Sequence, residues 1–149
     1  MKRSKLPGNV QRVLRLLGYL WASPNTLIGL VFCAIARVSG GEISVVDGVI
    51  EAHGGWTRPA LRRNPFMRNG IAAITFGHVV IGADQFRLER TRVHERVHVR
   101  QYAICGPFFL PLYLLSSAWC LVRRVDPYRQ NVFERQAYRI EAEWRERFT

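Results

Sequence analysis

Twenty consecutive residues without a charged side chain, residues 103–122, constrain the fold of this chain more than any other feature. A helix needs roughly 20 apolar residues to cross a bilayer, so this run is long enough to span one. Pro107 and Pro111 count against a single straight helix, because a proline inside a helix removes a hydrogen bond and bends the axis. Three interpretations stay open: a spanning helix, a kinked or re-entrant element, and a segment buried against other helices.

The N-terminal part of the chain predicts two further helices. Gln11, Arg12 and Arg15 lie off an apolar face, which indicates a basic amphipathic helix ending near Trp21. That face consists of Val10, Val13, Leu14, Leu16 and Leu17. Residues 26–38 predict a strongly apolar second helix, which is short for a bilayer crossing and suits either a buried core or a membrane-embedded position.

From residue 42 the pattern changes to that of strands. β-Branched runs at residues 43–46 and 49–50 flank Asp47-Gly48, a favourable hairpin turn, and residues 71–81 predict a second strand pair. Residues 53–70, rich in Gly, Pro and Arg, are expected to form an exposed loop that includes His53. We therefore predict an α+β fold in one domain, residues 1–149. In it, helices in residues 1–39 precede a small antiparallel sheet and the remaining helices in residues 40–149.

Two helices are predicted on either side of the charge-free run. Asp84 is a suitable N-cap for a helix over residues 85–103, which Gly106-Pro107 ends. Asn131 is a suitable N-cap for a final helix over residues 132–147. The sheet is expected to pack on the first of these helices, with the apolar helices facing a membrane.

The first of these helices carries the sequence His94-Glu95-Arg96-Val97-His98. Histidines four residues apart project from one helical face one turn apart, so both imidazoles can bind one tetrahedral ion, and Zn²⁺ is the predicted metal. Glu95 is then placed to take a proton from water activated by the metal and to pass it to a leaving amine. The alternative is a solvated helix face whose histidines pair with nearby acids.

A catalytic zinc site needs a third protein ligand, and Glu134 is the preferred candidate. Its position three residues after Asn131 also fits a capping box, in which it would bond only to its own helix. Glu141, His78 and Asp126 remain alternative ligands. His78 is also a candidate catalytic residue that stabilises the oxyanion, although a structural place in a strand is the simpler interpretation.

A shared metal would have a topological consequence. If His94, His98 and Glu134 bind one ion, the helices that carry them lie on the same side of any membrane. A straight crossing by residues 103–122 is then excluded, which favours the bent or buried interpretations of that run.

Charge and cysteine content indicate the class of binding partner and the cellular compartment of the protein. Twenty-two Lys and Arg against eleven Asp and Glu give a formal charge of +11, which implies an acidic partner. Because arginines flank the apolar runs, anionic membrane lipid is a better candidate than nucleic acid. Cys33, Cys105 and Cys120 lie in apolar runs without metal-like spacing, as expected of small buried residues in a reducing compartment or of residues that face lipid. We expect attachment to the bacterial inner membrane, with the site on the cytoplasmic side.

These residues resemble a known pattern. His94-Glu95-x-x-His98 with Glu134-x-x-Ala137 resembles the gluzincin zinc metalloproteases, and residues 94–101, 106–111 and 131–134 resemble small bacterial membrane-associated HExxH proteins. The resemblance implies zinc bound by His94, His98 and Glu134, with Glu95 as the base. It predicts a minimal membrane-associated metallopeptidase that cleaves a peptide or protein substrate. The alternatives are a metal-stabilised membrane scaffold, and a basic module that binds membrane surfaces or nucleic acid.

Overall fold

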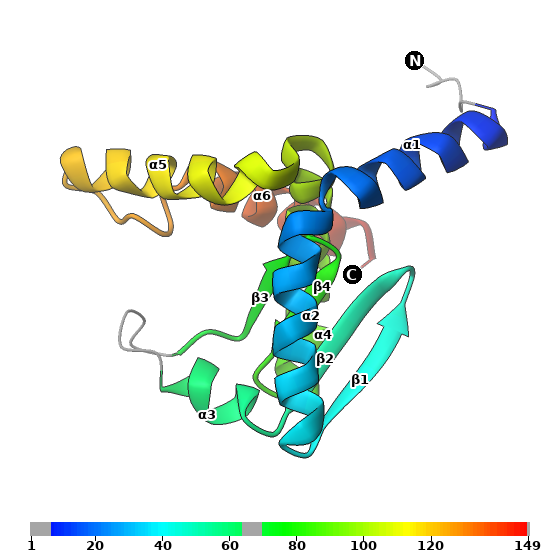
Figure 1. Ribbon diagram of the computed structural model, residues 1–149. Coiled ribbons are helices and arrows are strands. Elements are labelled where there is room, and N and C mark those ends of the chain that lie inside the picture. Colours follow the sequence, from blue (N-terminus) through cyan, green and yellow to red (C-terminus); the bar gives the residue numbers. More distant parts are fainter. Residues whose placement is uncertain (1–6, 64–69, 149) are drawn as a thin grey trace.

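The computed structural model describes residues 7–63 and 70–148, so part of the expected loop at residues 53–70 lies outside the described residues. Its elements run in the following order (Figure 1): α1 (Gly8–Trp21), α2 (Ser23–Val38), β1 (Gly41–Val46), β2 (Val49–Gly54), α3 (Thr57–Arg62), β3 (Ala73–Phe76), β4 (Val79–Gly82), α4 (Gln85–Cys105), the 3₁₀ turn η1 (Gly106–Phe108), α5 (Phe109–Val122) and α6 (Val132–Phe148). The α+β class is confirmed. The loop expected at residues 53–70 contains the end of β2, with His53, and the short helix α3.

The four strands form one sheet in the order β1-β2-β4-β3. Both predicted hairpins are present as antiparallel pairs, but β2 and β4 pair in parallel, so the sheet is mixed and the expectation of an antiparallel sheet was wrong. The physical reason is the burial of β4. All four of its residues are buried, whereas buried and half-buried residues alternate in β3, so β4 takes the inner place and β3 the edge.

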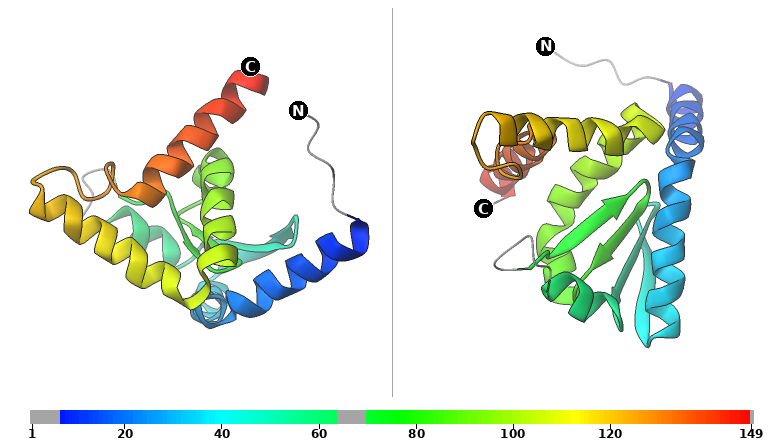
Figure 2. Two further views of the ribbon diagram at one scale, coloured as in Figure 1. Left: turned by 90° about the horizontal axis from the view of Figure 1, so that it is seen from above. Right: turned by 60° about the vertical axis from the view of Figure 1, so that its left-hand side comes forward.

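Helices cover both faces of the sheet, which explains why β4 is buried throughout (Figures 1 and 2). Helix α2 packs on one face through a cluster made of Cys33, Ala36, Ala52, Val79 and Ile81. Helix α4 packs on the other face through a cluster made of Val49, Ala73, Val80, Leu88 and Val99. The alternation of side chains along the strands sends neighbouring residues of β4 into different clusters.

Local signals in the sequence are confirmed where they can be checked. Asp47 and Gly48 adopt positive φ angles of 49° and 77°, as a tight hairpin turn requires. The Asp84 carboxylate accepts a hydrogen bond of 2.9 Å from the Arg87 N–H and so caps α4. Helix α4 runs two residues past its predicted end, to Cys105.

The charge-free run does not form one straight helix. The chain turns at η1, and α5 extends across the end of the molecule at which α4 finishes (Figures 1 and 2). Pro111 lies in the first turn of α5, where its missing N–H removes no helical bond, so the break falls at Gly106 instead.

Length and composition allow a membrane crossing in the described residues. The stretch Gln85–Val122, taken through η1, contains one sufficiently apolar window, of which 17% is buried. Helices α1 and α2, bent by 67° at their junction, would add a second crossing if they were counted as one span.

Candidate metal centre

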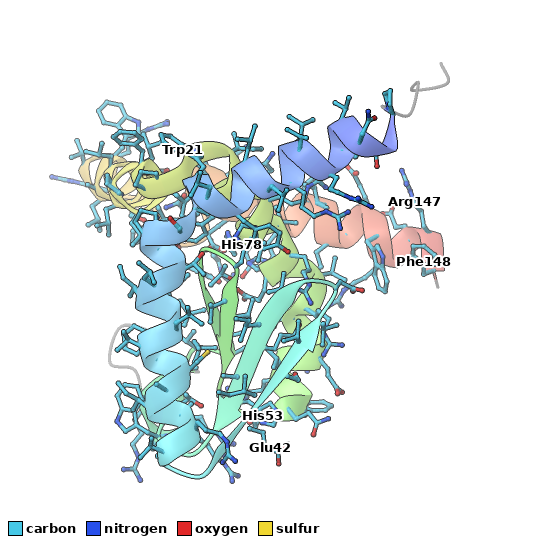
Figure 3. All side chains as sticks on the ribbon, turned by 45° about the vertical axis from the view of Figure 1, so that its right-hand side comes forward. Trp21, Glu42, His53, His78, Arg147 and Phe148 are labelled. Carbon is cyan, nitrogen blue, oxygen red and sulfur yellow. The ribbon has the colours of Figure 1, made fainter. Side chains whose placement is uncertain are left out.

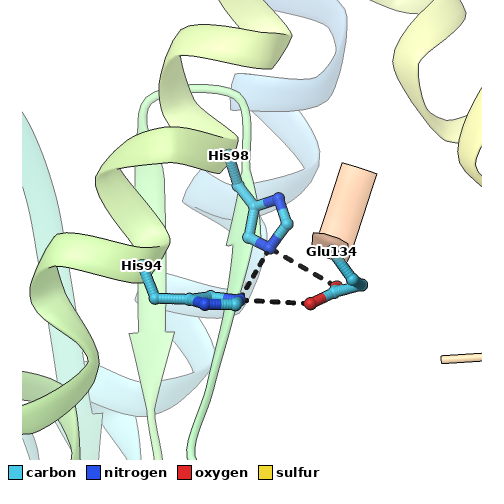
Figure 4. A group of neighbouring side chains, drawn as sticks. All are labelled: His94, His98 and Glu134. Atoms are coloured by element: carbon cyan, nitrogen blue, oxygen red, sulfur yellow. Dashed lines mark hydrogen bonds and ion pairs between the residues drawn. The ribbon is translucent and has the colours of Figure 1, made fainter. Parts of the chain in front are cut away.

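Three buried side chains from two helices converge at the predicted site (Figure 4). His94 and His98 project from α4, and their Nε2 atoms lie 3.1 Å apart. Glu134 reaches them from the first turn of α6, which packs on α4. Its Oε2 atom is 3.1 Å from His94 Nε2, and its Oε1 atom is 3.4 Å from His98 Nε2. The sequence therefore predicted all three members of this group.

These separations suit a tetrahedral zinc ion. Ligand atoms about 2.0–2.1 Å from such an ion lie roughly 3.3–3.4 Å from one another. The two imidazole nitrogens lie 3.1 Å apart, and each lies 3.1 or 3.4 Å from a different oxygen of Glu134, so each contact by itself is close to that value. One ligand atom from each of the three residues can be chosen so that all lie within 4.8 Å of one another. Two imidazole nitrogens and one carboxylate oxygen are also a donor set that zinc accepts, so the group could hold a metal ion.

The remaining ring nitrogens face polar partners on the outer side of the group. His98 Nδ1 lies 2.8 Å from Gln101 Oε1, and His94 Nδ1 lies 3.3 Å from Glu141 Oε2. An acceptor at Nδ1 holds the proton there and leaves Nε2 free to bind a metal. Both imidazoles are therefore oriented with Nε2 toward the centre of the group, where it can bind a metal once any proton on it has left.

Glu134 faces the imidazoles rather than the backbone of its own helix. Its Oε1 atom accepts a hydrogen bond of 2.8 Å from the Tyr113 hydroxyl, and it is 3% exposed. The capping-box alternative fails because the Asn131 N–H donates to the Tyr128 carbonyl, although Asn131 itself caps α6 by accepting from the Phe133 N–H.

The charge of Glu134 is also favoured by its surroundings. Burial alone would raise the pKa of Glu134, but hydrogen bonds from His94 and His98 outweigh it and lower the pKa to about 2. The carboxylate is therefore ionised at neutral pH, as a metal ligand must be.

Glu95 lies beside the histidines but contacts a different element. The Thr75 hydroxyl of β3 donates a hydrogen bond of 2.7 Å to Glu95 Oε2, which ties the carboxyl to the edge strand. Burial raises the pKa of Glu95, while the positive charge of His98 and the bond from Thr75 oppose the rise. A buried carboxyl with a raised pKa, next to a metal site, is what a general base near neutral pH requires.

A cavity of about 160 Å³ opens beside these groups. The edge strand β3 forms one wall, and α5 forms another. Aromatic side chains contribute from several elements, namely Tyr102, Phe109, Tyr113 and Tyr128. The cavity is therefore an apolar space with His94, Glu95, His98 and Glu134 on its surface.

The structure does not bring His78 to this cavity. His78 lies in the turn between β3 and β4, where its ring packs on Tyr19 at a centroid distance of 4.1 Å, and it is not among the residues that line the cavity. Its catalytic role stays a prediction, and this position lends it no support. Asp126 caps an exposed turn by accepting from the Tyr128 and Arg129 N–H groups.

Sequence reasoning missed the partners of the site residues. Gln101 lies three residues after His98 on the same helix, and this spacing could have predicted its contact with the His98 imidazole. Thr75, Tyr113 and Glu141 carry no such signal, because they reach the site from other elements. Glu141 was considered only as a metal ligand, yet it faces the far side of His94.

Comparison of the chain with protein-family models, with curated proteins and with solved structures finds no match in any of the three. The resemblance to gluzincins therefore rests on the HExxH residues and Glu134 alone.

Proposed function

We propose that the protein is a zinc metallopeptidase. The observation that carries this proposal is the convergence of His94, His98 and Glu134 beside a buried Glu95, at the surface of a cavity. Among the described residues the group offers three ligands, and the alternative Glu141 faces the outer Nδ1 of His94. Three protein ligands with a further position open to water are typical of catalytic zinc, whereas structural zinc has four.

The reaction adds water across an amide. Zinc, when bound, acts as a Lewis acid that polarises the carbonyl and makes water acidic enough to lose a proton near neutral pH. Glu95 takes that proton as the water oxygen bonds to the carbonyl carbon. It then donates the proton to the amide nitrogen as the C–N bond breaks, so that an acid and an amine leave. Thr75 holds Glu95 in place during both transfers.

The position of β3 supports a peptide as the substrate. Within residues 7–63 and 70–148, β3 has a strand partner on one side only, so no strand pairs with the N–H and C=O groups of its other edge. Residues of β3 line the cavity together with the metal-binding group. An extended peptide added along this edge would have its backbone beside Glu95.

Metal analysis and hydrolysis of a quenched-fluorescent peptide library test the proposal. Wild-type protein should hold about one zinc per chain and cleave peptides, and His94→Ala should lose both properties. Glu95→Gln should keep the zinc but lose cleavage, because an amide does not accept a proton at neutral pH. Zinc-loaded wild type without cleavage would favour the scaffold alternative, and full zinc content in His94→Ala would refute the site.

A further inference from the structure

Helix α1 turns its apolar face away from the rest of the protein. Leu16 and Leu20 on that face are 61% and 71% exposed. The contacts with the body lie on the other side, where Gly18 faces Ala103 and the Tyr19 hydroxyl donates 2.7 Å to the Gly48 carbonyl. A helix on the surface of a soluble domain has the opposite orientation, because its apolar face is what it buries.

Helix α5 is apolar on both its inner and its outer sides. It has no charged residue, yet only Phe109 and Cys120 are buried. Its inner side is anchored to the start of α6, where the Ser116 hydroxyl accepts from the Val132 N–H and the Ser117 hydroxyl accepts from Asn131. The outward residues that are more than 60% exposed are Leu114, Leu115, Trp119, Leu121 and Val122. Soluble monomers rarely leave so continuous an apolar surface in water.

The two helices lie at the same end of the molecule, on either side of η1 (Figures 1 and 2). Trp21 marks this end in Figure 3, and His53 and Glu42 mark the opposite end. The Trp21 and Phe108 rings, 6.1 Å apart, connect the two apolar faces. We call the exposed apolar faces of α1, η1 and α5 the platform.

The bend that places α5 in the platform is rigidly built. Gly106 has a φ angle of 56°, and a side chain there would collide with the Trp21 indole. The Trp21 indole N–H donates 3.2 Å to the Ile104 carbonyl, and the buried Asn25 amide donates 3.0 Å to the Gly106 carbonyl. These contacts oppose a straight continuation of α4 into α5.

Basic residues border the platform. Arg12 and Arg15 lie on α1 off its apolar face, and Arg123 and Arg124 follow the last residue of α5. All four are exposed, in a chain with a formal charge of +11. Apolar area flanked by arginine matches the boundary between acyl chains and anionic head groups.

We propose that the platform lies in one leaflet of an anionic bilayer, with α1 and α5 parallel to the membrane surface and neither crossing it. The sheet, α4 and the metal-binding group then lie in the aqueous phase on one side of the bilayer. This arrangement satisfies the requirement that α4 and α6 share a compartment.

The arrangement also narrows the substrate, if the proposed peptidase function holds. Tyr113 on the inner side of α5 lines the cavity and donates to Glu134. A helix is about 10 Å across, so the cavity lies roughly that far below the outer face of α5. The substrate class that fits is a membrane-anchored polypeptide, cleaved in the segment next to the bilayer.

Co-sedimentation with phosphatidylglycerol vesicles tests the platform without any activity. Leu16→Ser/Leu20→Ser should lower the partition coefficient by about tenfold or more. Phe86→Ser, a matched control with 71% exposure at the far end of α4, should leave it unchanged. Arg12→Gln/Arg15→Gln should lower it by about fivefold per arginine. Equal vesicle binding by all variants would overturn the proposal. It would also be overturned if the wild type formed a dimer without lipid, did not bind vesicles, and lost the dimer in Leu16→Ser/Leu20→Ser, because the apolar face would then bind a second copy of the chain.

Depth measurements distinguish an in-plane helix from a spanning one. Trp119 lies eleven residues beyond Phe108, which is roughly 16 Å along a helix axis. Two single-tryptophan proteins, with Trp21 or Trp119 kept and the others changed to Phe, are quenched with lipids brominated at known depths. Equal shallow depths are expected for both. A Trp119 that lies about 16 Å deeper than Trp21 would overturn the in-plane arrangement.

Cleavage of one peptide, tested both free and fused to a membrane anchor, distinguishes the proposed peptidase function from the proposed membrane platform and its substrate class. Faster cleavage of the anchored form, lost in Leu16→Ser/Leu20→Ser, is expected. Equal cleavage of both forms would overturn the substrate class but leave the peptidase intact. Vesicle binding without any cleavage would refute the peptidase but leave the platform intact.

Discussion

Removing the Glu141 carboxylate should weaken zinc binding without abolishing it. Glu141 Oε2 lies 3.3 Å from His94 Nδ1, the ring nitrogen that points away from the metal-binding group. Outer partners of this kind orient the imidazole and raise its basicity, and their loss typically lowers metal affinity by about 10–100-fold.

The structure places the effect at the lower end of that range. The 3.3 Å separation is longer than the roughly 2.7–2.9 Å of a strong charge-assisted hydrogen bond. Glu141 is also shared with Arg145, whose guanidinium is 2.6 Å from Oε1. We therefore expect about a tenfold loss for Glu141→Ala, equivalent to about 1.4 kcal/mol. Glu141→Gln, which keeps an acceptor oxygen but no charge, should lose roughly threefold.

Competition with a chromophoric chelator measures the affinity, and the visible spectrum of the cobalt(II) form reports the ligand geometry. Glu143→Gln is the matched control, because Glu143 is an exposed carboxylate on the same helix. Unchanged affinity in Glu141→Ala would refute the orienting role. A loss above a hundredfold with an altered cobalt spectrum would make Glu141 a direct ligand, since each ligand contributes roughly 3–5 kcal/mol.

Three further predictions concern stability, pH and the second partner of Glu134. Asn131→Ala should lower the free energy of unfolding by about 2–4 kcal/mol in urea denaturation, because the fully buried amide makes three hydrogen bonds; a change below about 0.5 kcal/mol would contradict this. Burial lowers the pKa of His98, but the hydrogen bond to Glu134 and the charge of Glu95 outweigh it and raise the pKa above 6.5. The proton on His98 must leave before zinc binds, so chelator competition should show affinity that falls as pH drops through that raised pKa; pH-independent affinity would contradict this. Tyr113→Phe should weaken zinc binding by about three- to tenfold in the same assay, because Glu134 loses a hydrogen bond to its charged oxygen; wild-type affinity would exclude this contribution.

Features that depend on neighbours within one helical turn could be predicted from the amino-acid pattern. His94 and His98 share a face because a helix has 3.6 residues per turn, whatever surrounds it. Asp84 caps α4 through a backbone N–H three residues away, and Asp47-Gly48 turns β1 into β2 through its own φ angles. These interactions close within a few residues, so the local pattern was enough to predict them.

Contacts between elements distant in sequence selected among the hydrogen-bond partners and positions that the local pattern left open. The Glu134 carboxylate could have bonded to its own helix or to the imidazoles, and only the packing of α6 on α4, forty residues away in sequence, selected the imidazoles. The periodicity of α1 predicts an apolar face but does not predict the direction in which that face points. The contacts of Gly18 and Tyr19 with the rest of the protein fix the opposite side of the helix, so the apolar face points outward. Likewise β4, and not β3, lies in the interior of the sheet, because helices α2 and α4 cover β4 on both faces and all four of its residues are buried.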